Sequence, residues 1–287
     1  MPEADAARAP TDEIARVEAL GRRVTTPCGA GEMVWRIWGE GPPLVLLHGN
    51  FGSWLHWIRN VEALAKHYTV MVPDTPGFGE SAVPSEFDTP RAIASVVADG
   101  IAEIVPPAQK VIVVGFSYGG RLAGEVAVIM GDRLELLFVV APGGLGIDDS
   151  AMTGLAKLRP RMTPEEIADV HRQNLAMLMI ADPEAVDDLA VHIQDVNTRR
   201  SRIRLTSWTV EDRQSSLARA LPQVEVPVKG IWADRDAFAG DTLQSRIDLV
   251  GRIHPGSDIR LLKDAGHWMQ YEAPDRFNAL LLEMLGA

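Results

Sequence analysis

The stretch Val111-Ile112-Val113-Val114-Gly115-Phe116-Ser117-Tyr118-Gly119-Gly120 decides the fold of this 287-residue chain. Its first four residues are β-branched and apolar, which is typical of a fully buried strand. The strand leads directly into Gly-x-Ser-x-Gly, and a helical segment follows from residue 121. In this context the pentapeptide predicts a nucleophile elbow, a turn that lifts the Ser117 hydroxyl to the end of a sheet. Glycines flank the serine because Cβ atoms there would collide with neighbouring backbone.

Strands and helices alternate on both sides of this elbow. Helices are predicted near 89–104, directly after Ser117 and near 274–285. An α/β fold follows from the alternation, with a mostly parallel sheet and helices on both faces. The predicted strands are 22–28, 32–38, 44–47, 70–72, 111–114, 135–141, 226–232 and 258–262.

The alternation stops after residue 146. From about 147 to 218 only helical periodicity is found, with helix starts at Thr163-Pro164 and Asp182-Pro183. An all-helical block between strands predicts a cap inserted over one end of the sheet. The predicted division is an N-terminal tail and short helix over 1–21, an α/β core over 22–146 and 219–287, and the cap over 147–218.

The net charge and composition of the chain limit the kinds of molecule that we expect it to bind. A net charge of −11 and a pI near 5.1 argue against nucleic acid and against an anionic membrane surface. No run approaches the ~18 apolar residues of a membrane span, and the N-terminus does not resemble a signal peptide. We therefore expect a cytoplasmic protein with a small-molecule substrate; the sequence leaves a homo-oligomer open.

Polar residues that could activate Ser117 follow the later strands. A serine hydroxyl needs a base, and the base needs an orienting group. His267 follows the strand 258–262, and Asp236 follows the strand that ends at Trp232. Asp234 is a rival for the acid. The remaining histidines, among them His67, His171 and His254, are expected mostly at the surface.

The loop after the strand 44–47 has the composition of an oxyanion-binding loop. Acyl transfer needs hydrogen-bond donors for the developing oxyanion, and the backbone N–H groups of Asn50 and Tyr118 are the candidates. His48 is expected to brace the loop. The residues expected to line the substrate pocket are Phe51, Met177 and Trp268, and a Met/Leu cluster in the cap indicates an apolar pocket.

Taken together, these motifs resemble the α/β-hydrolase superfamily. The matching stretches include His48-Gly49, 74–81, the elbow, 232–236 and Gly266-His267, and they span about residues 22 to 287. The order Ser117, Asp236, His267 is the order of that family. The resemblance also favours Asp236 over Asp234, because the family usually places its acid at the second aspartate.

Two stretches, 141–146 and 266–272, resemble a narrower branch, the meta-cleavage-product hydrolases, which split C–C bonds in vinylogous diketones. That branch has a longer Gly/Pro-rich oxyanion loop than this chain. It also uses a cap arginine for the substrate carboxylate, where this chain reads Val191-His192-Ile193. Arg199 and Arg200 are nearby, but adjacent arginines on a cap helix are more typical of a solvated face.

The sequence therefore predicts a serine hydrolase that cleaves a small, largely apolar carboxylic ester through an acyl-enzyme. Serine at position 117 argues against a haloalkane dehalogenase and the usual epoxide hydrolase of this fold, which need aspartate there. C–C hydrolysis of 2-hydroxy-6-oxo-dienoates is the alternative, and a non-catalytic ligand receptor is an alternative of another class. No cofactor or metal is predicted, because the chain has one cysteine and no dinucleotide, phosphate-loop or HExxH motif.

Overall fold

One eight-stranded sheet runs through the computed structural model, which describes residues 8–147 and 154–287. The first residues of the predicted tail and residues 148–153 of the predicted cap lie outside the described part. The strand order is β1-β2-β4-β3-β5-β6-β7-β8. Pairing is antiparallel for β1–β2 and β2–β4 and parallel elsewhere, so the predicted mostly parallel α/β sheet is confirmed. The strands are β1 (Arg22–Cys28), β2 (Gly31–Trp38), β3 (Pro43–Leu47), β4 (Thr69–Pro73), β5 (Val111–Phe116), β6 (Leu134–Val140), β7 (Val228–Ala233) and β8 (Asp258–Leu262).

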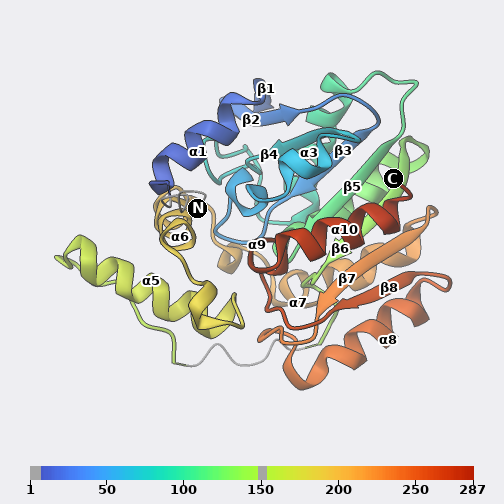
Figure 1. The fold of residues 1–287 in the computed structure, drawn as a ribbon. Helices are drawn as coiled ribbons and strands as arrows, with labels where there is room; N and C mark the ends of the chain where they lie inside the picture. The colour runs from blue at the N-terminus through green and yellow to red at the C-terminus, as the bar shows by residue number, and fades with distance from the viewer. Residues whose placement is uncertain (1–7, 148–153) are drawn as a thin grey trace, which may run out of the picture.

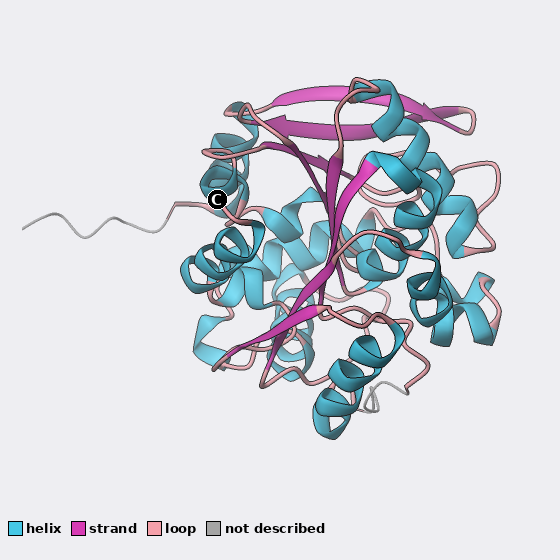
Figure 2. Cartoon of the chain, turned by 90° about the vertical axis from the view of Figure 1, so that its right-hand side faces the viewer, coloured by secondary structure: helices cyan, strands magenta, loops and turns pink. Residues whose placement is uncertain are grey.

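Helices lie on both sides of the twisted sheet (Figure 2). One group, α3, α4 and α7, packs together in series, and another, α2, α9 and α10, packs around the short 3-10 helix η1 (Trp54–Trp57) and its neighbours. The α-helices are α1 (Pro10–Ala19), α2 (Val61–Leu64), α3 (Pro90–Ile104), α4 (Tyr118–Met130), α5 (Pro164–Leu178), α6 (Asp188–Arg199), α7 (Val210–Ala220), α8 (Leu243–Ile253), α9 (Met269–Glu272) and α10 (Pro274–Leu285). Within the two described segments, no helix is long and apolar enough to cross a membrane.

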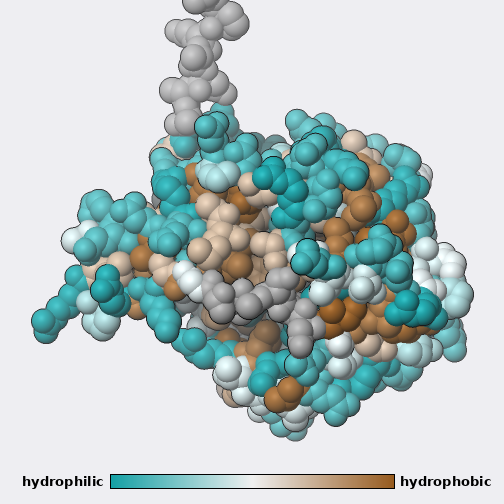
Figure 3. Space-filling model, turned by 90° about the horizontal axis from the view of Figure 1, so that it is seen from below, coloured by the Kyte–Doolittle hydropathy of each residue, from teal (hydrophilic) through white to brown (hydrophobic). Residues whose placement is uncertain are grey.

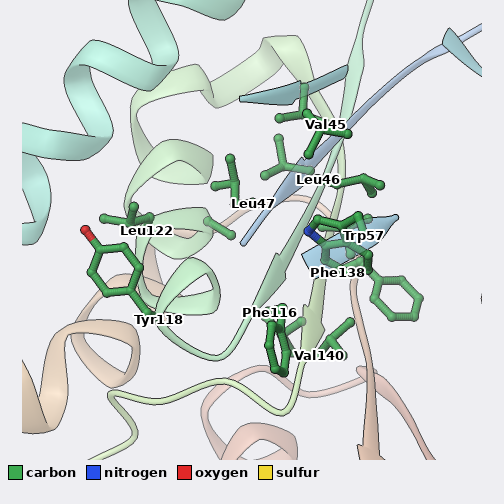
Figure 4. Packing of buried hydrophobic residues seen from close by; sticks show 14 of the residues in the cluster. Val45, Leu46, Leu47, Trp57, Phe116, Tyr118, Leu122, Phe138 and Val140 are labelled. Atoms are coloured by element: carbon green, nitrogen blue, oxygen red, sulfur yellow. The ribbon is translucent and has the colours of Figure 1, made fainter. Parts of the chain in front are cut away.

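The central strands are buried on both faces, which explains their continuous apolar runs. Figure 4 shows how side chains of β3, β5 and β6 meet in this core, with Phe116 and Val140 at the same end of neighbouring strands. The parallel strands β3, β5, β6, β7 and β8 all direct their carboxyl ends to one edge of the sheet. In open α/β sheets that edge is where ligands bind.

Helices α5 and α6, from the region predicted to be a cap, pack against each other and lie to one side of the sheet in Figure 1. Thr163 caps α5 through a capping box with Glu166, as the Thr-Pro start indicates. The second predicted start is displaced: Asp182 caps only a 3-10 turn, and Asp187 caps α6. Seen from below, hydrophobic residues gather towards the middle of the molecule, with hydrophilic ones around them (Figure 3).

The last helix before β7 belongs to the core by its packing. The side chain of Leu217 on α7 lies so close to α4 that a Cβ on Gly124 would be 2.6 Å from it. Helix α7 therefore packs against α4, although most of it falls within the predicted cap region. Helix α8 was not predicted from the sequence, although its apolar residues Leu243, Ile247 and Val250 follow helical spacing.

Candidate active site

Ser117 lies at the carboxyl end of β5, in the turn that begins α4. Its backbone has φ 53° and ψ −112°, a region that residues other than glycine seldom adopt. The flanking glycines allow this turn. A Cβ on Gly115 would lie 2.3 Å from the carbonyl oxygen of Gly119, and a Cβ on Gly119 would lie 2.4 Å from that of Leu47. The collision predicted from the sequence is therefore present at both positions.

The His267 ring joins Ser117 to Asp236. Its Nε2 lies 2.9 Å from Ser117 Oγ, and its Nδ1 lies 2.8 Å from Asp236 Oδ2. A carboxylate beside Nδ1 keeps the proton on that nitrogen, so Nε2 is left to accept the Ser117 hydroxyl proton. The loop that carries His267 is held by Glu272, whose carboxylate accepts a hydrogen bond from the Gly266 N–H at 2.7 Å.

Asp236 is buried and stays ionised. Its Oδ1 accepts hydrogen bonds from the N–H groups of Phe238 and Ala239, at 2.8 and 3.3 Å. Burial favours the neutral carboxyl, but the charge of His267 and these hydrogen bonds outweigh it and hold the pKa of Asp236 below its ordinary value. Asp234 lies instead 3.8 Å from the Nζ of Lys263. Of the two aspartates that the sequence offers, the structure brings Asp236 to His267.

Two backbone N–H groups lie beside the cavity next to Ser117. Asn50 and Tyr118 both line the cavity there, and neither N–H donates a hydrogen bond to any residue of the described segments. The Asn50 side chain faces its own loop, since Oδ1 accepts from the Phe51 N–H at 3.0 Å. Phe51 also lines the cavity, with φ 49°. The two N–H groups have the chemistry of an oxyanion site.

Hydrogen bonds to side chains from the neighbouring segments hold the loop that carries Asn50. The Asp74 carboxylate, after β4, accepts the N–H of Trp54 at 2.9 Å and that of Glu80 at 2.9 Å. His48 is fully buried and accepts the Thr75 N–H at Nε2, as expected of a bracing side chain. Burial lowers the pKa of His48, so the ring is neutral.

His56 is a buried member of the wall that the sequence did not reveal. Its Nδ1 accepts the Gly49 N–H at 3.2 Å. Burial lowers the pKa of His56 well below its ordinary value, and a proton on His48 or His267 would lower it further. The ring is therefore neutral, with its proton on Nε2. No periodic signal marks such a histidine, because its environment is built from the elbow strand and Trp268.

A cavity of about 660 Å³ connects Ser117, His267 and Asp236 to the cap. That volume is typical of sites for small organic molecules. The apolar wall includes Val170, Leu175, Leu178 and Met179 of the α5 segment, and Phe238. Four cationic residues also line it, although the chain as a whole is acidic: Arg121, Lys157, Arg204 and Arg246. The wall of the cavity is therefore mainly apolar, as the sequence predicts, with cationic groups among its apolar side chains.

Two predictions about the wall are wrong, and so is the surface position expected for His171. Met177 faces outward and is 40% exposed, because α5 turns its neighbours Leu175 and Leu178 inward. Trp268 lies behind the wall, fully buried, where its indole N–H donates to the His56 carbonyl and its ring stacks on Tyr271. His171, expected at the surface, is buried and lines the cavity. Arg199 and Arg200 remain outside and pair with Asp195 and Glu80.

A model of the alpha/beta hydrolase family matches residues 44–280. The chain belongs to the α/β hydrolase family. Among the curated relatives of this hydrolase, a 2-hydroxy-6-oxononadienedioate/2-hydroxy-6-oxononatrienedioate hydrolase of Comamonas testosteroni is 26% identical over 266 residues, which are 86% of this chain and 88% of the relative. A soluble epoxide hydrolase of Corynebacterium sp. is 37% identical over 258 residues, covering 82% of this chain and 87% of the relative.

Solved structures carry the same fold. An esterase from Thermogutta terrifontis has a TM-score of 0.69 to this hydrolase at 23% identity, with 92% of this chain and 98% of that chain covered. At that identity the likeness shows the fold alone. In the described residues of this hydrolase, no group of three or more His, Cys, Asp or Glu side chains could hold a metal ion.

Proposed function

We propose that the protein is a serine hydrolase that cleaves carboxylic esters of small to moderate size through an acyl-enzyme. The observation that carries this proposal is the continuous hydrogen-bonded series from Asp236 through His267 to Ser117, at the floor of a cavity of about 660 Å³. Serine rather than aspartate at position 117 supports ester chemistry over the epoxide opening of the Corynebacterium relative.

The residues of the site divide the steps of ester hydrolysis among them. His267 Nε2 takes the proton as Ser117 Oγ attacks the ester carbonyl, and Asp236 stabilises the imidazolium that forms. The N–H groups of Asn50 and Tyr118 stabilise the oxyanion of the tetrahedral intermediate. His267 returns the proton to the leaving alcohol, which departs and leaves the acyl group on Ser117. Water, deprotonated by the same ring, then attacks the acyl-enzyme and releases the acid.

The experiment that tests this is active-site labelling beside turnover. A fluorophosphonate should label one residue per chain, Ser117, and 4-nitrophenyl esters should be hydrolysed with loss of activity in proportion to labelling. Labelling elsewhere, or turnover that persists in fully labelled protein, would contradict the proposal. Absence of both turnover and labelling would instead favour a non-catalytic receptor.

C–C hydrolysis of a dienoate is a second candidate, and the charge of the wall favours it. A dienoate carries a carboxylate that is expensive to bury without a cation. The cavity has cationic side chains although Arg199 and Arg200 lie outside it, and the Comamonas testosteroni relative bears the name of such a hydrolase. Cationic side chains of the wall can pair with such a carboxylate, so the rates on the two kinds of substrate decide between the candidates. Faster turnover of a meta-cleavage dienoate than of an aryl ester would reverse the order of the two candidates.

A further inference from the structure

The cap wall of the cavity is divided into an apolar and a polar part. Helix α5 contributes mainly apolar side chains to it. Helix α6 contributes the polar residues Gln194 and Thr198, and Ser201, two residues beyond the end of the helix, is a third. The spacing of four residues puts Gln194 and Thr198 on one face of α6. We call these three residues the polar stripe.

The hydrogen bonds within the polar stripe leave both donors and acceptors available. The Gln194 amide donates from Nε2 to Thr198 Oγ1 at 3.2 Å. The Thr198 hydroxyl therefore keeps its proton for another acceptor, and the Gln194 Oε1 keeps its lone pairs. The Ser201 hydroxyl is buried and has no partner in the described segments of the chain. The free functions of Gln194 and Thr198 are therefore available to a ligand in the cavity.

His171 adds an acceptor from α5. Its ring is 4% exposed and lines the same cavity. Nε2 lies 3.4 Å from Asp195 Oδ1, so in the neutral ring Nε2 carries the proton towards the carboxylate and Nδ1 remains an acceptor. Burial lowers the pKa of His171 and outweighs the opposing effect of Asp195, which favours the neutral ring. Within the described chain, nothing donates to Nδ1.

The charges around the polar stripe select among polar ligands. The Asp195 carboxylate is engaged by His171 and by Arg199, whose side chain points outward. The stripe itself holds no charged side chain. A neutral group that both donates and accepts fits this set best, because it can donate to Gln194 Oε1 or His171 Nδ1 and accept from the Thr198 hydroxyl. An alcohol has this pair of functions, whereas a ketone or ether only accepts.

We infer that the polar stripe and His171 form a subsite for an alcohol hydroxyl on the part of the substrate that lies under the cap. The subsite rests on the proposed ester hydrolysis and specifies its substrate as hydroxylated. The apolar residues of α5 then hold the hydrocarbon that carries the hydroxyl. A substrate without the hydroxyl would leave the polar groups of the subsite unpaired, and this cost favours the hydroxylated substrate.

The test compares matched esters that differ only in the hydroxyl. 4-Nitrophenyl 3- and 4-(hydroxymethyl)benzoates are assayed beside the corresponding ethylbenzoates, which have the same shape. For at least one of the two ring positions, we expect kcat/KM for the hydroxylated ester to be higher by about tenfold, the effect of one well-made neutral hydrogen bond. A ratio of one or less at both positions would overturn the inference.

Substitutions in the polar stripe test whether it causes the preference for the hydroxylated ester. Thr198→Val is isosteric, and together with Gln194→Leu it should bring the ratio close to one. His192→Gln changes a residue of the same helix that does not line the cavity, and it should leave the ratio as it is in the wild type. A ratio that survives Thr198→Val with Gln194→Leu would place the selectivity elsewhere and refute the subsite.

Failure of the subsite and failure of the proposed function give different results. If neither ester of a pair is hydrolysed and fluorophosphonate does not label Ser117, the hydrolase proposal itself fails. If both esters are hydrolysed and labelling blocks both, but the hydroxyl has no effect, only the subsite fails.

Discussion

Replacing Asp236 by asparagine should abolish most activity because of how the new amide must orient. Oδ1 of Asp236 accepts the N–H groups of Phe238 and Ala239, so the carbonyl oxygen of an asparagine is retained at that position. Its NH₂ group then occupies the place of Oδ2, 2.8 Å from His267 Nδ1. A donor there requires Nδ1 to accept, which moves the ring proton to Nε2, towards Ser117.

A ring protonated at Nε2 cannot take the serine proton. In serine proteases the corresponding wrong tautomer lowers kcat by about 10⁴-fold, or about 5.5 kcal/mol of transition-state stabilisation. We expect a similar loss here for Asp236→Asn. The assay is kcat/KM for a 4-nitrophenyl ester, with the rate of fluorophosphonate labelling as a second measure of Ser117 reactivity.

The matched control is Asp234→Asn, two residues earlier and beside Lys263. This variant should stay within about threefold of the wild type, because the partly exposed pair of Asp234 with Lys263 touches no reacting group. Thermal unfolding of both variants shows whether the fold is retained. Asp236→Asn activity within tenfold of the wild type, or a larger loss in Asp234→Asn, would refute the reasoning.

Three further predictions concern other parts of the site. Ser117→Ala should lower ester turnover by at least about 10⁴-fold with an unchanged melting temperature, and residual activity near a tenth of the wild type would exclude Ser117 as the nucleophile. Gly119→Ala should destabilise the fold by on the order of 3 kcal/mol or prevent folding, since its Cβ meets backbone at 2.4 Å; Gly251→Ala on α8, where a Cβ meets nothing within 4 Å, should instead stabilise by up to about 1 kcal/mol in urea unfolding. Burial lowers the pKa of His56 in the folded chain, so the neutral ring contributes fully to stability above the unfolded-state pKa of ~6.5, and this contribution is lost as the pH falls. Up to about 2 kcal/mol of the free energy of unfolding should disappear between pH 7 and 5. His56→Asn should show a weaker pH dependence in urea titrations even if it is less stable at pH 7.

Much of the fold was predictable because the informative patterns are local. A buried parallel strand is a short apolar run, and the glycines of the elbow are required by backbone approach within a few residues. The polar residues after such runs must gather at one edge of the sheet, since parallel strands share a direction. Ser117 and His267 could therefore be paired from the sequence although 150 residues separate them.

Where a side chain points could not be predicted for residues that pack against segments far away in the sequence. His171 and Met177 lie on the same helix, and only the packing of α5 against α6 decides that the histidine faces the cavity and the methionine faces solvent. Trp268 follows His267 directly, yet His56 and Tyr271 draw it into the core.

The sequence by itself determined the α/β sheet, the elbow at Ser117 and the set of polar groups at the strand ends. The family resemblance favours Asp236 over Asp234, but only the tertiary structure shows that Asp236 contacts His267 whereas Asp234 lies near Lys263, because two residues in one loop differ in which neighbours they reach. The tertiary structure also decided that the cap wall is polar along α6. The physical reason is that backbone conformation is set largely by neighbours in the chain, whereas the direction and ionisation of a side chain depend on contacts between segments far apart in it.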